Sequence, residues 1–151
     1  MGQGMIKTLF LMGALIGVPL GSIAQKGGAS GPLHTPRKGS AEEQSILKGL
    51  RNQGSEYYKK AVSFKVEYLK VHNGWAWADV VPLDDHHKPT AEGGPNLLQL
   101  KAGHWTTLDL SKVPADPNNP MGPEDISPVY IKNLRKQFPG LPADILPQPT
   151  H

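Results

Sequence analysis

The stretch VHNGWAWADV, residues 71–80, constrains the fold of this chain more than any other segment. Asn73-Gly74 lies between two runs that are rich in β-branched and aromatic residues. Asn-Gly between such runs is a strong hairpin signal, because a type I′ turn needs positive φ at both central residues. A two-residue loop predicts three cross-strand pairs: His72 with Trp75, Lys70 with Trp77, and Tyr68 with Asp79.

This register sorts the side chains of the hairpin onto two faces. One face gathers the bulky residues Phe64, Val66, Tyr68, Trp75, Trp77, Val81 and Leu83. The chain has no cysteine and therefore no disulfide to stabilise it. Burying these rings matters, since truncating a core Trp or Phe costs on the order of 3–5 kcal/mol. We expect the tryptophan face to be core and to meet a helix; the alternative is an exposed ligand platform.

A helix is predicted immediately before the hairpin, over residues 41–52. Ser40 stands three residues before Glu43, which is the spacing of a capping box, and Gly54 is a natural stop. The apolar residues form a narrow stripe at helical spacing: Ile46, Leu47 and Leu50. Gly49 weakens such a helix by roughly 1 kcal/mol relative to alanine, so the helix needs a sheet to pack on.

A second hairpin and a second helix follow. The segment NLLQLKAGHWTTLDL predicts two short strands around an Ala102-Gly103 turn, and Ser127 with Pro128 at the first helical position predicts a helix start. Pro139 ends that helix, and a proline-rich tail follows. The expected fold is α+β: an N-terminal helix packed on a curled antiparallel sheet of about four strands, then a second short helix and an extended tail.

The first residues have the pattern of a secretory signal. A short basic leader precedes TLFLMGALIGVPLG, and SIAQ supplies small residues for cleavage after Ala24. The apolar run is short for a bilayer span; an uncleaved anchor is the alternative. We therefore expect a signal peptide (1–24), a flexible lead-in (25–39), a single domain (40–147) and a tail (148–151). The predicted location is periplasmic or secreted, with no stable membrane anchor after cleavage.

Charge and motifs narrow the classes of function. Sixteen Lys and Arg against 13 Asp and Glu is a slight excess, and the basic residues lack the clustering of a nucleic-acid surface. The sequence contains no G-x-S-x-G, no H-E-x-x-H and no cysteine nucleophile. This favours a non-enzymatic protein without a cofactor, although an enzyme is not excluded. Oligomeric state is left open.

One candidate binding site lies at the polar end of the tryptophan face. Its residues are Lys70, His72, Trp75, Trp77 and Asp79. Aromatic rings flanked by polar groups suit a sugar ring or an extended peptide, and Lys70 over an indole would make a cation–π contact. The competing interpretation is a core with a polar rim.

A candidate metal site lies in the loop of residues 84–95. Its ligands would be Asp84, Asp85, His86 and His87, which suit Zn²⁺ or Cu²⁺. Structural zinc ligands, however, usually come from separated pairs with fixed spacing. A polar turn is the competing interpretation.

The segments LKVHNGWAWADVVPLD, LLQLKAGHW and NLRKQFPGLPADILP resemble those of small secreted bacterial proteins, most of them uncharacterised. These proteins share a GWAW strand and an FPxxPxDI ending, and the resemblance covers roughly residues 40–147. It implies a cystatin-like or nuclear-transport-factor-like fold, which hosts enzymes and non-enzymes alike. It implies no catalytic residues, and the Asp84–His87 loop departs from the plain Asp-Gly turn common in the group.

Together these features predict an exported, non-catalytic domain that binds another envelope or extracellular molecule, either a protein or a glycan. Two alternatives remain open at this point. One is a metal-dependent protein or enzyme that uses the 84–95 loop. The other is a structural accessory domain without a small ligand.

Overall fold

The computed structural model describes residues 31–149. Its main elements are α1 (Ala41–Gln53), α2 (Glu56–Lys60), β1 (Ser63–His72), β2 (Trp75–Leu83), β3 (Gly94–Lys101), β4 (His104–Leu108) and α3 (Pro128–Gln137). Three 3₁₀ turns complete the order: η1 (Leu110–Lys112), η2 (Gly122–Glu124) and η3 (Ala143–Ile145). The strands form one antiparallel sheet in the order β1-β2-β3-β4.

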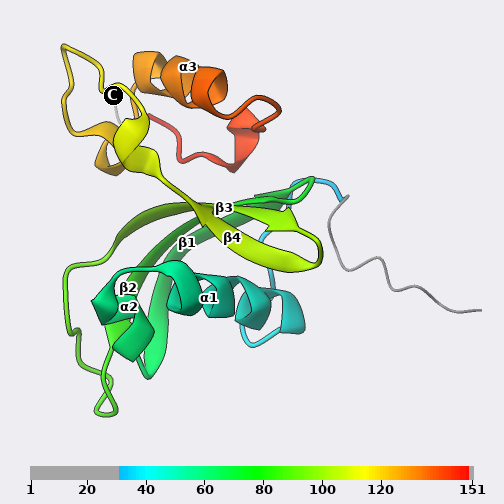
Figure 1. Ribbon diagram of the computed structural model, residues 1–151, viewed down its shortest axis with the longest axis vertical. Coiled ribbons are helices and arrows are strands. Elements are labelled where there is room, and N and C mark those ends of the chain that lie inside the picture. The colour runs from blue at the N-terminus through cyan, green and yellow to red at the C-terminus, as the bar shows by residue number, and fades with distance from the viewer. Residues whose placement is uncertain (1–30, 150–151) are drawn as a thin grey trace, which may run out of the picture.

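The sheet lies between α1 and α2 on one side and α3 with the C-terminal segment on the other (Figure 1). The predicted α+β class, with a helix before four antiparallel strands and a later short helix, is confirmed. The predicted signal peptide lies outside the described residues, as does the lead-in up to residue 30. Within residues 31–149 no helix has the length and apolar character needed to cross a membrane.

The helix starts follow their predicted caps. Ser40 Oγ accepts a hydrogen bond from the Glu43 N–H at 3.2 Å, and Ser127 Oγ accepts one from the Tyr130 N–H at 3.1 Å. Glu43 reaches back to the N–H of Gly39 instead of that of Ser40. The five-residue helix α2 was not predicted.

Both hairpins have two-residue turns at the predicted positions, Asn73-Gly74 and Ala102-Gly103. Asn73 and Gly74 have φ values of 48° and 76°, as a type I′ turn requires. The three predicted pairs are present: His72 with Trp75, Lys70 with Trp77, and Tyr68 with Asp79. Across the second hairpin, Lys101 pairs with His104.

A β-bulge overturns the predicted face of Phe64 and Val66. Tyr68 pairs with Asp79, but Val66 pairs with Val80, so Glu67 is an extra residue in β1. Because side chains alternate between faces, one extra residue moves every side chain before it to the opposite face. Phe64 and Val66 therefore pack with the α1 layer and not with the tryptophans.

The predicted partner of the tryptophan face is also wrong. Trp75 is 7% exposed and Trp77 is fully buried, which confirms that both indoles are core. Their cover is the C-terminal part of the chain: Val113, Ile126, Tyr130, Leu134, Leu141, Ile145 and Leu146. Helix α1 packs on the opposite face, where Ala76 and Ala78 leave room for it. Both faces of β2 are apolar, so alternation alone does not identify the face that meets α1.

Candidate functional site

The five predicted binding residues do not form one site. Trp75 and Trp77 lie under the C-terminal segment and present no platform to solvent. His72 Nδ1 lies 2.8 Å from Asp144 Oδ1 and links β1 to the same segment. Lys70 lies opposite Trp77 within the sheet. The cation–π contact among the described residues, however, is the one between Arg51 and the Phe64 ring. Asp79 lines a small cleft, and of the other four residues only Trp77 lines it as well.

The four predicted metal ligands form a tight turn. Asp84 Oδ1 accepts hydrogen bonds from the N–H groups of His86 at 2.9 Å and Lys88 at 2.8 Å, and His87 has φ 59°. The side chains of Asp85 and His86 are each 76% exposed. Within residues 31–149 no three His, Asp or Glu side chains are grouped to hold a metal ion. Metal binding at this loop stays a prediction without geometric support.

The two edges of the sheet differ in how far the rest of the chain covers them. At β4, a backbone amide, the Thr107 N–H, donates to Gln53 Oε1 of α1 at 3.2 Å. The outer side of β1, within the described residues, pairs only at Val71. The N–H of His34 donates to the Val71 carbonyl at 3.0 Å, and the Val71 N–H donates to the His34 carbonyl at 2.9 Å.

The strand register shows which other backbone groups of β1 point outward. Hydrogen-bonding directions alternate along an antiparallel strand, so the backbone N–H and C=O of Leu69 point outward like those of Val71. Beyond the bulge, Phe64 lies opposite Pro82 of β2. Pro82 has no N–H, and its carbonyl accepts a hydrogen bond from the Thr90 N–H on the side of β2 away from β1. The N–H and C=O of Phe64 therefore also point outward, and alternation adds those of Val66. No segment of residues 31–149 pairs with these groups.

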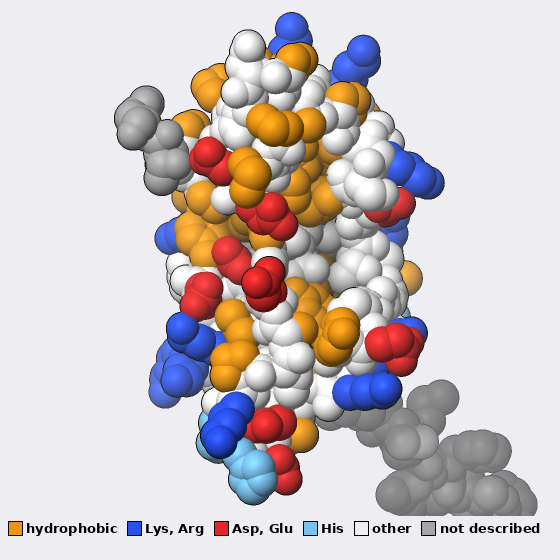
Figure 2. Space-filling model, turned by 90° about the vertical axis from the view of Figure 1, so that its left-hand side faces the viewer, with side chains coloured by type: hydrophobic (Ala, Val, Ile, Leu, Met, Phe, Trp, Pro, Cys, Tyr) orange, Lys and Arg blue, Asp and Glu red, His pale blue; other side chains and the backbone are white. Residues whose placement is uncertain are grey.

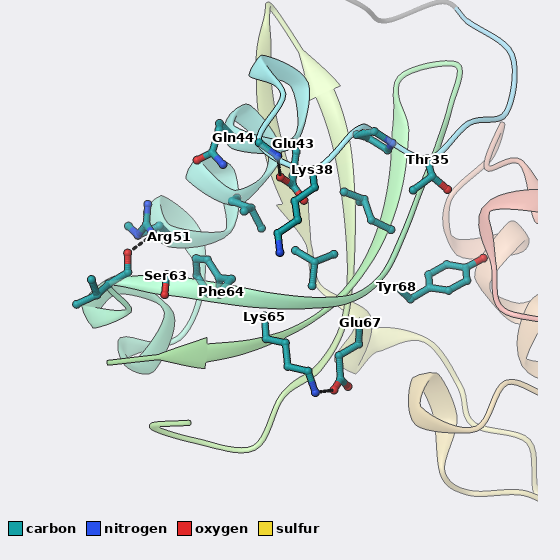
Figure 3. Close-up of a pocket in the computed structure, with 16 residues that line it drawn as sticks. Thr35, Lys38, Glu43, Gln44, Arg51, Ser63, Phe64, Lys65, Glu67 and Tyr68 are labelled. Atoms are coloured by element: carbon teal, nitrogen blue, oxygen red, sulfur yellow. Dashed lines mark hydrogen bonds and ion pairs between the residues drawn. The ribbon is translucent and has the colours of Figure 1, made fainter. Parts of the chain in front are cut away.

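A groove of about 580 Å³ runs beside this open edge, between α1 and β1. Both elements contribute apolar lining residues, and two more come from the segments before them: Leu47, Phe64, Val66, Leu69, Pro36 and Val62. Arg51 borders it, donating to the carbonyls of Ala61 at 3.2 Å and Val62 at 3.3 Å while its guanidinium lies 5.2 Å from the Phe64 ring centroid. In Figure 3, Lys38 points into the groove, whereas Lys65 and Glu67 point to the other side of β1.

A smaller cleft of about 260 Å³ opens on the tryptophan face. Trp77 and Asp79 of β2 form part of its wall, and Glu124 lines it from η2. Burial raises the pKa of the Asp79 carboxyl, and the nearby carboxylates of Glu67 and Glu124 raise it further. Figure 2 shows acidic side chains among hydrophobic ones across the middle of one side of the molecule.

Of the residues that line these surfaces, the predicted binding site included Trp77 and Asp79. The open edge could have been predicted from the order of the strands, because the first strand of a meander lies at an edge of the sheet. Glu124 had none, since it comes from an irregular proline-rich segment.

No protein-family model, curated protein or solved structure matches this chain. The resemblance to small secreted bacterial proteins therefore stays a prediction.

Proposed function

We propose that this chain is an exported, non-catalytic domain that binds an extended segment of another envelope or extracellular protein along β1. The observation that carries the proposal is the row of outward N–H and C=O groups at Phe64, Val66 and Leu69, beside a groove with an apolar lining. An added strand would pair with these groups. Main-chain hydrogen bonds then supply affinity, and pockets for alternate side chains supply specificity.

A protein ligand fits this surface better than a glycan. Recognition of a sugar ring relies on an exposed aromatic face, but Trp75 and Trp77 are buried. The groove presents aliphatic side chains, the half-buried Phe64 and the amine of Lys38. These favour a segment whose every second residue is apolar.

Two further expectations belong to this proposal. The apolar run at residues 8–21 supports export to the periplasm or beyond. The order of one helix and then a four-stranded antiparallel meander supports a cystatin-like or nuclear-transport-factor-like arrangement.

The test uses peptides and backbone hydrogen exchange. Short random peptides displayed on phage are selected against the mature chain, and the enriched sequences are synthesised. NMR then measures amide exchange with and without peptide. We expect slower exchange at Phe64, Val66 and Leu69, because their N–H groups acquire acceptors, and no change at Thr106 of β4. Slowing confined to another surface would contradict the proposal.

A variant gives a second readout. In Val66→Pro the outward N–H is lost and the ring obstructs the edge, while the sheet keeps its bonds because prolines are tolerated on edge strands. We expect peptide affinity to fall about tenfold or more. Val129→Ala, at an exposed position of α3, is the matched control and keeps wild-type affinity. Equal affinity in Val66→Pro and wild type would rule out pairing along β1.

A further inference from the structure

The groove and the acidic cleft meet at the bulge of β1. Glu67 and Tyr68 line both of them, although the two openings lie on opposite faces of the sheet. Side chains of an extended strand alternate between faces. A segment added to β1 therefore sends one set of side chains toward α1 and the other set toward the cleft.

The cleft carries negative charge that the described chain does not neutralise. Glu67 pairs with Lys65 at 2.7 Å. Asp79 and Glu124 have no hydrogen-bond or ion-pair partner among residues 31–149, and Asp79 is half-buried. An unpaired carboxylate that has lost part of its hydration is unfavourable, and a cation placed beside it relieves that cost.

A second observation at the same place is a buried donor without an acceptor. Trp77 is fully buried and lines the cleft, and its Nε1–H has no hydrogen-bond partner in the described part of the chain. Buried polar groups of native proteins are nearly always paired, so an unpaired one calls for an explanation. The indole that carries this donor lines the cleft, so a ligand bound there lies against it.

The walls of the cleft suit a long basic side chain. Three prolines, from different parts of the chain, line it beside the acidic groups: Pro95, Pro123 and Pro147. Lysine and arginine bury their aliphatic stems against apolar surface while their charged ends reach polar groups.

We infer that this cleft binds the arginine or lysine side chain of the segment that lies along β1, with Asp79 and Glu124 as its carboxylate partners. The inference rests on the proposed function. It adds the chemistry of the bound segment, in which apolar residues facing the groove alternate with a basic residue facing the cleft.

The experiment compares two capped peptides, one alternating valine with arginine and the other valine with glutamate, together with acetyl-arginine amide. Titration calorimetry measures affinity, and the indole N–H resonance of Trp77 reports occupancy. We expect the arginine peptide to bind about fivefold tighter or more. The formal net charge of the chain is +3, so overall charge opposes this preference and only a local acidic site produces it.

Variants test whether the cleft produces the preference for the arginine peptide. Asp79→Asn and Glu124→Gln each reduce the arginine-to-glutamate affinity ratio, and the double variant abolishes it. Neither change is expected to prevent folding, because removing an unpaired carboxylate relieves repulsion. Glu56→Gln, at an exposed carboxylate on α2, is the matched control and leaves the ratio unchanged.

The outcomes separate the two proposals. Equal binding of both peptides along β1 overturns the basic-residue inference and leaves the proposed function standing. Binding of neither peptide, together with failure of the phage selection, overturns the proposed function and the inference with it. Asp79-dependent binding of acetyl-arginine amide without peptide binding shows a site for a free cation, which also overturns the inference.

Discussion

Gly49 of α1 lies against Trp105 of β4. A Cβ atom added at this position would be 2.6 Å from the backbone carbonyl oxygen of Trp105 and 2.9 Å from its Cβ. Gly54, the C-cap of α1, has φ −77° and likewise leaves no space for a Cβ, because the Leu50 carbonyl and Tyr58 lie against it. Both glycines are thus explained by close approach and not by positive φ.

This contact decides the effect of Gly49→Ala. Helix propensity alone predicts a gain of about 1 kcal/mol. Overpacking against the backbone of β4, a strand paired with β3, costs typically about 1–3 kcal/mol, so we expect a net loss of stability in urea unfolding. Lys48→Ala, one residue earlier and exposed, is the control and stays within about 0.5 kcal/mol of wild type. A Gly49→Ala variant more stable than wild type would show that the helix moves away freely.

Asp116 and Ser127 form a buried pair at the start of α3. The Ser127 hydroxyl donates to Asp116 Oδ2 at 2.7 Å, and the Asn118 N–H donates to Oδ1 at 2.9 Å. These two bonds, the hydroxyl first, hold the pKa of the Asp116 carboxyl below its usual value. The charged carboxylate therefore fixes the serine that caps α3.

The direction of this shift predicts a pH dependence. A carboxyl whose pKa is lower in the folded state stabilises the fold above its unfolded pKa, about 4. That contribution disappears as the pH falls through the lower, folded pKa. We expect the Tm of wild type to fall more steeply than that of Asp116→Asn below about pH 4, measured by calorimetry. Asp85→Asn, an exposed carboxylate in the 84–88 turn, should follow wild type; parallel Asp116→Asn and wild-type curves would refute the assignment.

At the scale of elements, the C-terminal segment takes the place that sequence analysis assigned to α1. Its η3 turn lies against β1 and β2 beside the tryptophans. The Tyr68 hydroxyl donates to the Ile145 carbonyl at 2.9 Å, and His72 pairs with Asp144. These contacts join residues that are more than 70 positions apart in the chain.

Ile145→Ala tests this packing. Ile145 is fully buried, and an Ile-to-Ala change in a core costs about 2–5 kcal/mol. We expect a loss in that range in urea unfolding, followed by tryptophan fluorescence. Gln148→Ala, three residues later and exposed, is the control and has little effect. A loss well under 1 kcal/mol for Ile145→Ala would mean that the segment contributes little to the tryptophan core.

The bulge at Glu67 is the other element-scale feature that shapes the surface. It places Phe64 and Val66 over the α1 groove while Tyr68 stays with the tryptophans. Bulges and edge charges also limit indiscriminate pairing between sheet edges. Lys65 and Glu67 supply such charges beside the bulge.

In the whole molecule, one sheet separates two hydrophobic cores (Figure 1). The chain has no disulfide, and burial on both faces of β2 provides the packing that replaces it. This arrangement leaves most of the outer side of β1 without a partner in the described chain.

The sequence by itself determined the two hairpin turns, the starts of α1 and α3, and the strand pairing next to each turn. Asn73-Gly74, Ser40 and Ser127 act through backbone groups only a few residues away, so their signals are complete within short segments. Buried indoles were also predictable, because a chain without disulfides needs large apolar groups in its core.

Only the tertiary structure decided which layer covers which face. Alternation distinguishes two faces but does not identify the partner of each when both are apolar, and the bulge at Glu67 changes the face within a strand. The acidic cleft shows the same limit: Asp79 was a candidate from sequence, but its neighbour Glu124 comes from a segment some 45 residues away in the chain. Such contacts follow from the packing of the whole chain, which no local pattern encodes.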